Sequence, residues 1–152
     1  MRLLRPWLIA TCIIPLTLSA EEPVDKAFDK DVLVIAARDA CHRFDIYLAL
    51  SHVQQRRGLM RIRSLPSSTG MLFVYSTENY HSMWMKNTFI PLDILFARSD
   101  GGVASIAKNT EPQSLKSISS TEPVMFVLEL NAGTTERLAI EPAGDARLDE
   151  PL

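Results

Sequence analysis

Short apolar segments separated by turn-forming residues are the feature that most constrains the fold of this 152-residue chain. Segments rich in β-branched and aromatic residues, or alternating between apolar and polar residues, are typical of strands. The sequence predicts eight of them: Val32–Ala36, His42–Leu48, Met71–Tyr75, Met83–Met85, Leu92–Arg98, Val103–Ala107, Val124–Leu130 and Thr134–Ile140. Because helices do not alternate with them, we expect a mostly β fold, a single antiparallel β-sandwich or a partly open barrel.

One short helix is expected near residues 52–58, between the second and third strands. Ser51 can act as its N-cap, with Gln54 as the capping-box partner, and Gly58 can end it in the left-handed conformation. Residues 32–145 would form the β domain. The charged stretch 21–31 is interpreted as a linker and residues 146–152 as a loose tail.

The first twenty residues have the layout of a secretory signal peptide. Arg2 and Arg5 precede the uncharged, mostly apolar run Trp7–Leu18, and Ala20 ends a stretch of small residues. The alternative, a membrane anchor, is disfavoured because a helix needs about 20 apolar residues to span a bilayer. We therefore expect cleavage after Ala20, no stable membrane insertion afterwards, and a periplasmic or secreted location.

Removal of residues 1–20 leaves an acidic chain. The 16 basic residues fall by two to 14, against 18 acidic ones, a net charge near −4. Nucleic-acid binding usually needs a basic face, so no nucleic-acid partner is expected. Cys41 remains as a lone cysteine, without an internal disulfide, and is interpreted as a small core residue in preference to a reactive thiol or a metal ligand. We expect a monomer.

The stretch His81–Arg98 carries two charges, Lys86 and Asp93, inside the most hydrophobic part of the chain. An unpaired buried charge is costly, so each is either solvated or paired. Alternation along the strand places Asp93 opposite the core face, on a side that Leu95 suggests is also covered. A deeply buried Asp93 would be held by Arg57 or by backbone donors, and a solvated one by Lys86.

Five motifs occur in an order that resembles the DUF-192 family of small prokaryotic domains, which are of unknown function and often exported. They are Arg57-Gly58-Leu59-Met60, Gly70-Met71-Leu72-Phe73, Trp84-Met85-Lys86-Asn87-Thr88, Ile90-Pro91-Leu92-Asp93-Ile94 and Leu128-Glu129-Leu130-Asn131-Ala132-Gly133. The resemblance covers about residues 32–145. It implies a single β-rich, sandwich-like domain and no established reaction.

The motifs supply the candidate ligand-binding residues, which are Trp84, Lys86, Asn87, Asp93, Arg57 and Glu129. Their polar members would either form ion pairs that support the structure or line a pocket under Trp84. Trp84 itself is expected to be buried or to form a pocket wall. No catalytic residue is assigned, and no cofactor is expected.

The preferred interpretation is a non-catalytic ligand-binding or accessory domain of the cell envelope, with a small molecule or an envelope protein as its partner. The alternative is a small hydrolase that uses Asp93 and Glu129, for which both carboxylates must meet in one open cleft. The sequence contains no nucleophile motif or phosphate-binding glycine loop that would favour an enzyme.

A second alternative is a periplasmic Cu(I)-binding protein. His81, Met83 and Met85 lie close together, and thioether and imidazole ligands suit this soft ion. Methionines at strand spacing are also typical of a core, which is the preferred interpretation.

The exported protein should begin at Glu21, because the small residues before it match a signal-peptidase site. Mass spectrometry of the secreted protein is expected to give the mass of residues 21–152. Retention of residues 1–20 would contradict the predicted location.

Overall fold

The computed structural model describes residues 24–38, 40–142 and 146–149. The strands are β1 (Asp29–Ala37), β2 (Ala40–Ala49), β3 (Thr69–Asn79), β4 (Ser82–Met83), β5 (Leu92–Ala97), β6 (Val103–Ala107), β7 (Ile118–Ser119), β8 (Val124–Asn131) and β9 (Arg147–Asp149). The helices are α1 (Val24–Ala27), α2 (His52–Arg57) and α3 (Thr134–Arg137). Strands β4 and β7 pair with each other. The others form one sheet in the order β6-β5-β8-β3-β2-β1-β9.

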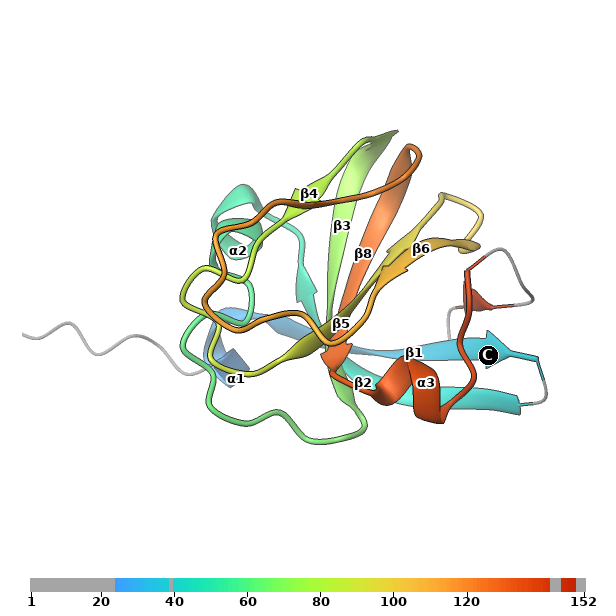
Figure 1. The fold of residues 1–152 in the computed structure, drawn as a ribbon, viewed down its shortest axis with the longest axis horizontal. Coiled ribbons are helices and arrows are strands. Elements are labelled where there is room, and N and C mark those ends of the chain that lie inside the picture. The colour runs from blue at the N-terminus through green and yellow to red at the C-terminus, as the bar shows by residue number, and fades with distance from the viewer. Residues whose placement is uncertain (1–23, 39, 143–145, 150–152) are drawn as a thin grey trace, which may run out of the picture.

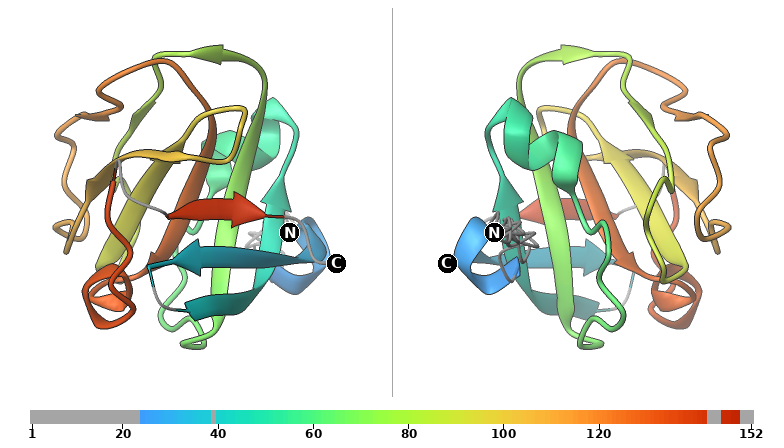
Figure 2. Two further views of the ribbon diagram at one scale, coloured as in Figure 1. Left: turned by 90° about the vertical axis from the view of Figure 1, so that its right-hand side faces the viewer. Right: turned by 90° about the vertical axis from the view of Figure 1, so that its left-hand side faces the viewer.

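The large sheet is strongly curled. Strands β1, β2 and β9 lie crosswise to β3, β8 and β5, so that the sheet forms a half-barrel (Figures 1 and 2). The mostly β fold, in its partly open barrel form, is therefore confirmed. In the described part of the chain, no helix is long and apolar enough to cross a membrane.

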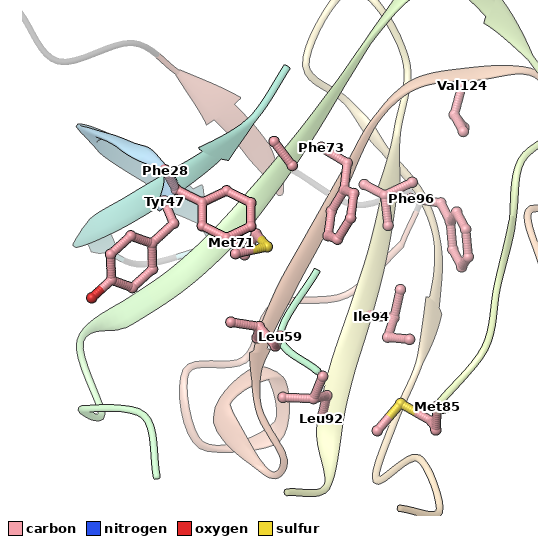
Figure 3. Packing of buried hydrophobic residues seen from close by; sticks show 12 residues of the cluster. Phe28, Tyr47, Leu59, Met71, Phe73, Met85, Leu92, Ile94, Phe96 and Val124 are labelled. Carbon is pink, nitrogen blue, oxygen red and sulfur yellow. The ribbon is translucent and has the colours of Figure 1, made fainter. Parts of the chain in front are cut away.

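Each face of the sheet carries its own hydrophobic cluster. Successive strand residues point to opposite faces. Leu92, Ile94 and Phe96 therefore join one cluster with Phe73 (Figure 3), while Leu95 joins the other. All six residues of β5 are buried, so both of its faces are covered, as the alternation predicted.

One strand pairing differs from the antiparallel arrangement that we expected. β2 and β3 are parallel, with Asp45 opposite Thr69 and Ala49 opposite Phe73. Parallel neighbours need a long crossover connection. Residues 50–68 provide it, since they contain α2 and a loop that returns the chain to the middle of β2, where Thr69 lies opposite Asp45. The short helix and its Ser51–Gln54 capping box are as predicted. Gly58 has the expected positive φ, 48°, but its ψ of −140° lies outside the left-handed helical conformation that we expected.

The two ends of the domain are more ordered than composition suggested. Within the expected linker, α1 forms and β1 already begins at Asp29, whose backbone pairs opposite Leu48. Within the expected loose tail, β9 pairs with β1. The exposed charged side chains of these segments gave no apolar pattern from which the sequence could predict this backbone pairing. The predicted signal peptide, residues 1–20, lies outside the described residues.

Two further expectations were wrong. The segment after Gly133 forms α3, not a strand, because Gly133 adopts a left-handed φ of 79° and turns the chain out of the sheet. Cys41 is exposed on β2 and is not a core residue, since it lies opposite Ala36, next to the turn of the β1–β2 hairpin.

Asp93 is fully buried on β5 and ties two distant segments to the sheet. Its Oδ1 accepts a hydrogen bond from the Asn109 N–H at 2.9 Å. Its Oδ2 accepts from the N–H of Thr135 at 2.9 Å and from the Thr135 hydroxyl at 2.8 Å. Two backbone N–H groups and one hydroxyl group therefore hold the Asp93 carboxylate. Backbone donors were one of the two alternatives expected for a buried Asp93.

Asp93→Ala should destabilise the domain by about 3–5 kcal/mol, because it leaves buried donors without their charged acceptor. Thr135→Val, which removes only the hydroxyl, should cost about 1–2 kcal/mol. Urea unfolding measures both changes. A loss below about 0.5 kcal/mol for Asp93→Ala would mean that the carboxylate does not hold the fold.

Candidate functional site

Two hollows that share part of their lining lie between α2 and the segment after β4. The outer hollow has a volume of about 530 Å³ and is lined by His52, Gln55, Arg56, Met60, Trp84, Lys86 and Asn87. The inner hollow, of about 50 Å³, extends from Gln55, Arg56, Met60 and Trp84 to Glu129. We refer to both together as the Trp84 site. It contains Trp84, Lys86 and Asn87 on the surface and Glu129 at its base.

Helix α2 supplies one wall of the Trp84 site. His52, Gln55 and Arg56 are three and four residues apart, which places them on one helical face. The Gln55 amide donates to the Val74 carbonyl at 2.9 Å, which ties the helix to β3. The polar face of α2 is therefore held in place by the sheet.

A tight turn supplies the opposite wall. Met85 is fully buried in the core, and alternation leaves Trp84 pointing outward, with 49% of it exposed. The Thr88 N–H donates to the Met85 carbonyl at 3.0 Å and closes the turn. Asn87 has a φ of 56°, a conformation that asparagine tolerates, and its carbonyl accepts from the Arg61 N–H at 2.7 Å.

Trp84 forms a pocket wall, one of the two positions expected for it, and is not part of the core. The Lys86 Nζ lies 5.0 Å from the centre of the Trp84 ring. This distance is within the range of a cation–π interaction, which favours a defined orientation of both side chains. The indole and the ammonium are thus held together at the mouth of the site.

Glu129 lies at the base of the Trp84 site. On β8 it is opposite Met71 and Ile94, so it shares the face of the first hydrophobic cluster. Glu129 is 4% exposed, and its Oε2 is buried without a hydrogen-bond partner. A buried polar atom without a partner is unusual and calls for an explanation.

Gly58 allows the end of α2 to lie directly over this carboxyl group. A Cβ on Gly58 would be 3.2 Å from the Phe73 ring and 4.0 Å from Glu129 Oε2. Its φ of 48° is also one that residues with side chains rarely adopt. A glycine at this position keeps the inner hollow open.

Burial raises the pKa of Glu129 from its ordinary value of 4.5 to about 8. The carboxyl group is therefore protonated and neutral at pH 7. The pKa of Tyr75 is also raised, first by its own burial and then by its proximity to Glu129. A neutral carboxyl group differs from a carboxylate because it can donate a hydrogen bond.

Asp93 and Glu129 face opposite sides of the sheet. Asp93 is opposite Leu130, and Glu129 is opposite Ile94, in the antiparallel β5–β8 ladder. Paired residues share a face and successive residues do not, so the two carboxyl groups are separated by the sheet itself. The hydrolase hypothesis required both in one open cleft and is therefore contradicted.

Arg57 lines the inner hollow and does not take the place that we considered for it beside Asp93. Its guanidinium carbon lies 5.5 Å from the centre of the Phe28 ring, next to α1. Arg57 therefore belongs to the base of the Trp84 site, on the side of α1.

The residues proposed for Cu(I) are engaged in packing. Met85 is in the core, and its sulfur accepts a hydrogen bond from the Thr110 hydroxyl at 3.2 Å. The His81 ring stacks on Tyr75 with 3.5 Å between centroids, and the Tyr75 hydroxyl lies 4.0 Å from the Met83 sulfur. Burial lowers the pKa of His81. This arrangement favours the core interpretation of these side chains.

Several residues of the site were not predicted from the sequence. Gln55, Arg56 and His52 share a helical face, and this spacing was a usable signal. Met60 belongs to the first family motif, but methionine is so common in hydrophobic cores that the sequence alone did not indicate its place at the site.

Glu129→Gln should change how the stability of the domain depends on pH. Folded Glu129 keeps its proton between pH 4.5 and about 8. The unfolded chain loses that proton, so the free energy of unfolding should fall with rising pH by about 1.4 kcal/mol per unit from this group. The variant carries no such proton. The difference between the two curves, measured by urea unfolding, should grow in favour of Glu129→Gln towards pH 8. Parallel curves would contradict the buried neutral acid.

Comparison with known proteins places the chain in a family. The model of DUF192, described as uncharacterized ACR, matches residues 33–147. A crystal structure from Sinorhizobium meliloti 1021, of a protein provisionally named a transcription regulator, is 40% identical, covers 80% of this chain and 94% of its own, and has a TM-score of 0.77. The crystal structure of a protein of unknown function from Novosphingobium aromaticivorans DSM 12444 is 32% identical and has a TM-score of 0.79. The match covers 86% of this chain and 91% of that protein's chain. No curated protein matches. This chain belongs to the DUF192 family.

Proposed function

We propose that this protein is an exported, monomeric, non-catalytic binding domain of the cell envelope, and that a small molecule binds in the Trp84 site. The observation that carries the proposal is the combination of a half-exposed indole with a buried carboxyl oxygen that has no hydrogen-bond partner beneath it. Small-molecule sites typically combine an apolar or aromatic wall with a few convergent polar groups. The outer hollow, at about 530 Å³, is within the usual size range of such sites.

Binding is favoured over catalysis because the described residues that line the inner hollow include no second carboxyl, imidazole or thiol group beside Glu129. The other residues that line the inner hollow are arginines, amide, thioether, hydroxyl and apolar groups. General acid–base chemistry needs a positioned pair with matched pKa values, and Asp93 is on the far side of the sheet.

Export is proposed from the first twenty residues, whose pattern is that of a cleaved signal. The relative from Sinorhizobium meliloti is provisionally named a transcription regulator. For the present chain, the net charge near −4 after loss of residues 1–20 favours a small ligand over a nucleic acid.

Trp84 fluorescence provides a direct test. The chain has two tryptophans, Trp7 and Trp84, so a protein that begins at Glu21 contains Trp84 alone. In a screen of organic acids, sugars and nucleotides, a true ligand should change Trp84 emission. It should also raise the melting temperature, with stabilisation of about 2.7 kcal/mol at 100 times Kd.

Lys86→Ala should weaken that binding, because it removes the cation beside the indole. Lys108→Ala is the matched control, since Lys108 is exposed and does not line either hollow. If both variants bind as the parent does, the ligand does not occupy the Trp84 site.

A further inference from the structure

The walls of the Trp84 site are cationic. Arg56 and Lys86 line the outer hollow, and Arg56 and Arg57 line the inner one. Glu129 is the one acidic residue among the described residues that line either hollow, and it is buried. Clefts with walls of one charge favour ligands of the opposite charge, here anions.

The Glu129 carboxyl group, at the base of the Trp84 site, can donate a hydrogen bond to an acceptor atom of a ligand. Glu129 is 4% exposed, its carboxyl group is protonated at pH 7, and its Oε2 has no hydrogen-bond partner. A protonated carboxyl group donates to an acceptor oxygen, and such a bond is strongest when the acceptor is an anion. The buried acid and the cationic walls therefore suit the same ligand group.

The inner hollow is much smaller than the outer one, at about 50 Å³ against about 530 Å³. A flat carboxylate has three heavy atoms, whereas a phosphate group has five in a tetrahedron. We therefore assign the smaller and flatter anionic group, a carboxylate, to the inner hollow.

The outer hollow suits an apolar body attached to that carboxylate. Trp84 offers an indole that is 49% exposed, and Met60 adds a thioether, which adapts to irregular shapes. Aromatic side chains bind other rings and alkyl chains through large contact areas. Both residues also line the inner hollow, so a single ligand would contact them and Glu129.

We infer that the ligand of the Trp84 site is a small organic acid, whose carboxylate accepts a hydrogen bond from Glu129 beside Arg56 and whose apolar body lies on Trp84 and Met60. This inference rests on the proposed function and specifies its ligand class.

Binding of such an acid depends on the proton of Glu129. Among the described residues, the charged or titratable groups around this carboxyl are Arg56 and Arg57 at the end of α2 and Tyr75 on β3, while β5 presents the uncharged Ile94. When Glu129 ionises, two carboxylates compete for this small space, and their repulsion weakens binding. Affinity should therefore fall as pH rises through about 8, the pKa of Glu129.

Titration with benzoate, followed by Trp84 fluorescence, tests the inference on the chain from Glu21. Benzoate should bind with a Kd of about 1 mM or tighter at pH 7. Benzamide, its neutral isostere, should bind at least about tenfold more weakly because it lacks the charge. Between pH 7 and pH 9 the affinity for benzoate should fall about tenfold, which follows from the change in the protonated fraction of a group with a pKa of about 8.

Glu129→Gln is the decisive variant. Its amide still donates a hydrogen bond but does not titrate, so benzoate should bind with an affinity that is constant over the same pH range. Arg56→Ala should weaken binding at least about tenfold. Arg63→Ala should not, because Arg63 lies over Phe89 and does not line either hollow. Melting temperatures of all variants confirm that each is folded.

The outcomes separate this inference from the proposed function. Equal binding of benzoate and benzamide, or the same pH dependence in the parent and Glu129→Gln, would overturn the organic-acid assignment. So would a failure of both benzoate and hexanoate to bind at about 20 mM. If another compound from the screen then binds and depends on Lys86, the proposed function stands. If no compound changes Trp84 emission, both fail.

Discussion

The buried carboxylate of Asp93 is the interaction on which the arrangement of this domain depends. A charge removed from water must be stabilised by several donors, and those donors must come from segments that can be brought to it. Here they come from Asn109, after β6, and from Thr135 in α3. These bonds hold α3 against the sheet, at a point where the sequence pattern alone favoured another strand.

The β5–β8 ladder gives two buried acids opposite roles. Asp93 and Glu129 are displaced by one residue in register, so they face different hydrophobic clusters. Asp93 has three donors, whereas Glu129 Oε2 has no hydrogen-bond partner and burial keeps Glu129 protonated. The first acid supports the structure. The second is the group that we propose as a contact for a ligand in the Trp84 site.

The family motifs converge in space on these two acids. Segments that contain Gly58, Trp84 and Glu129 are far apart in the sequence and meet in the inner hollow. The segment with Asp93 and the turn at Gly133 meet on the other face, through Thr135. The DUF192 motifs therefore include residues of the Asp93 hydrogen-bond network and residues of the inner hollow. The family match establishes the fold and does not identify a function.

Local sequence determined the elements and their faces. The capping box of α2, the alternation along β5 and the burial of Asp93 follow from residue spacing and from the cost of unpaired polar groups, which act over a few residues. Only the tertiary structure decided the parallel β2–β3 pairing, the replacement of the last predicted strand by α3, and the pairing of β9. It also decided that Trp84 faces outward above a protonated Glu129. Each of these depends on which distant segments supply hydrogen-bond partners and which exclude water, and spacing within one segment does not encode that information.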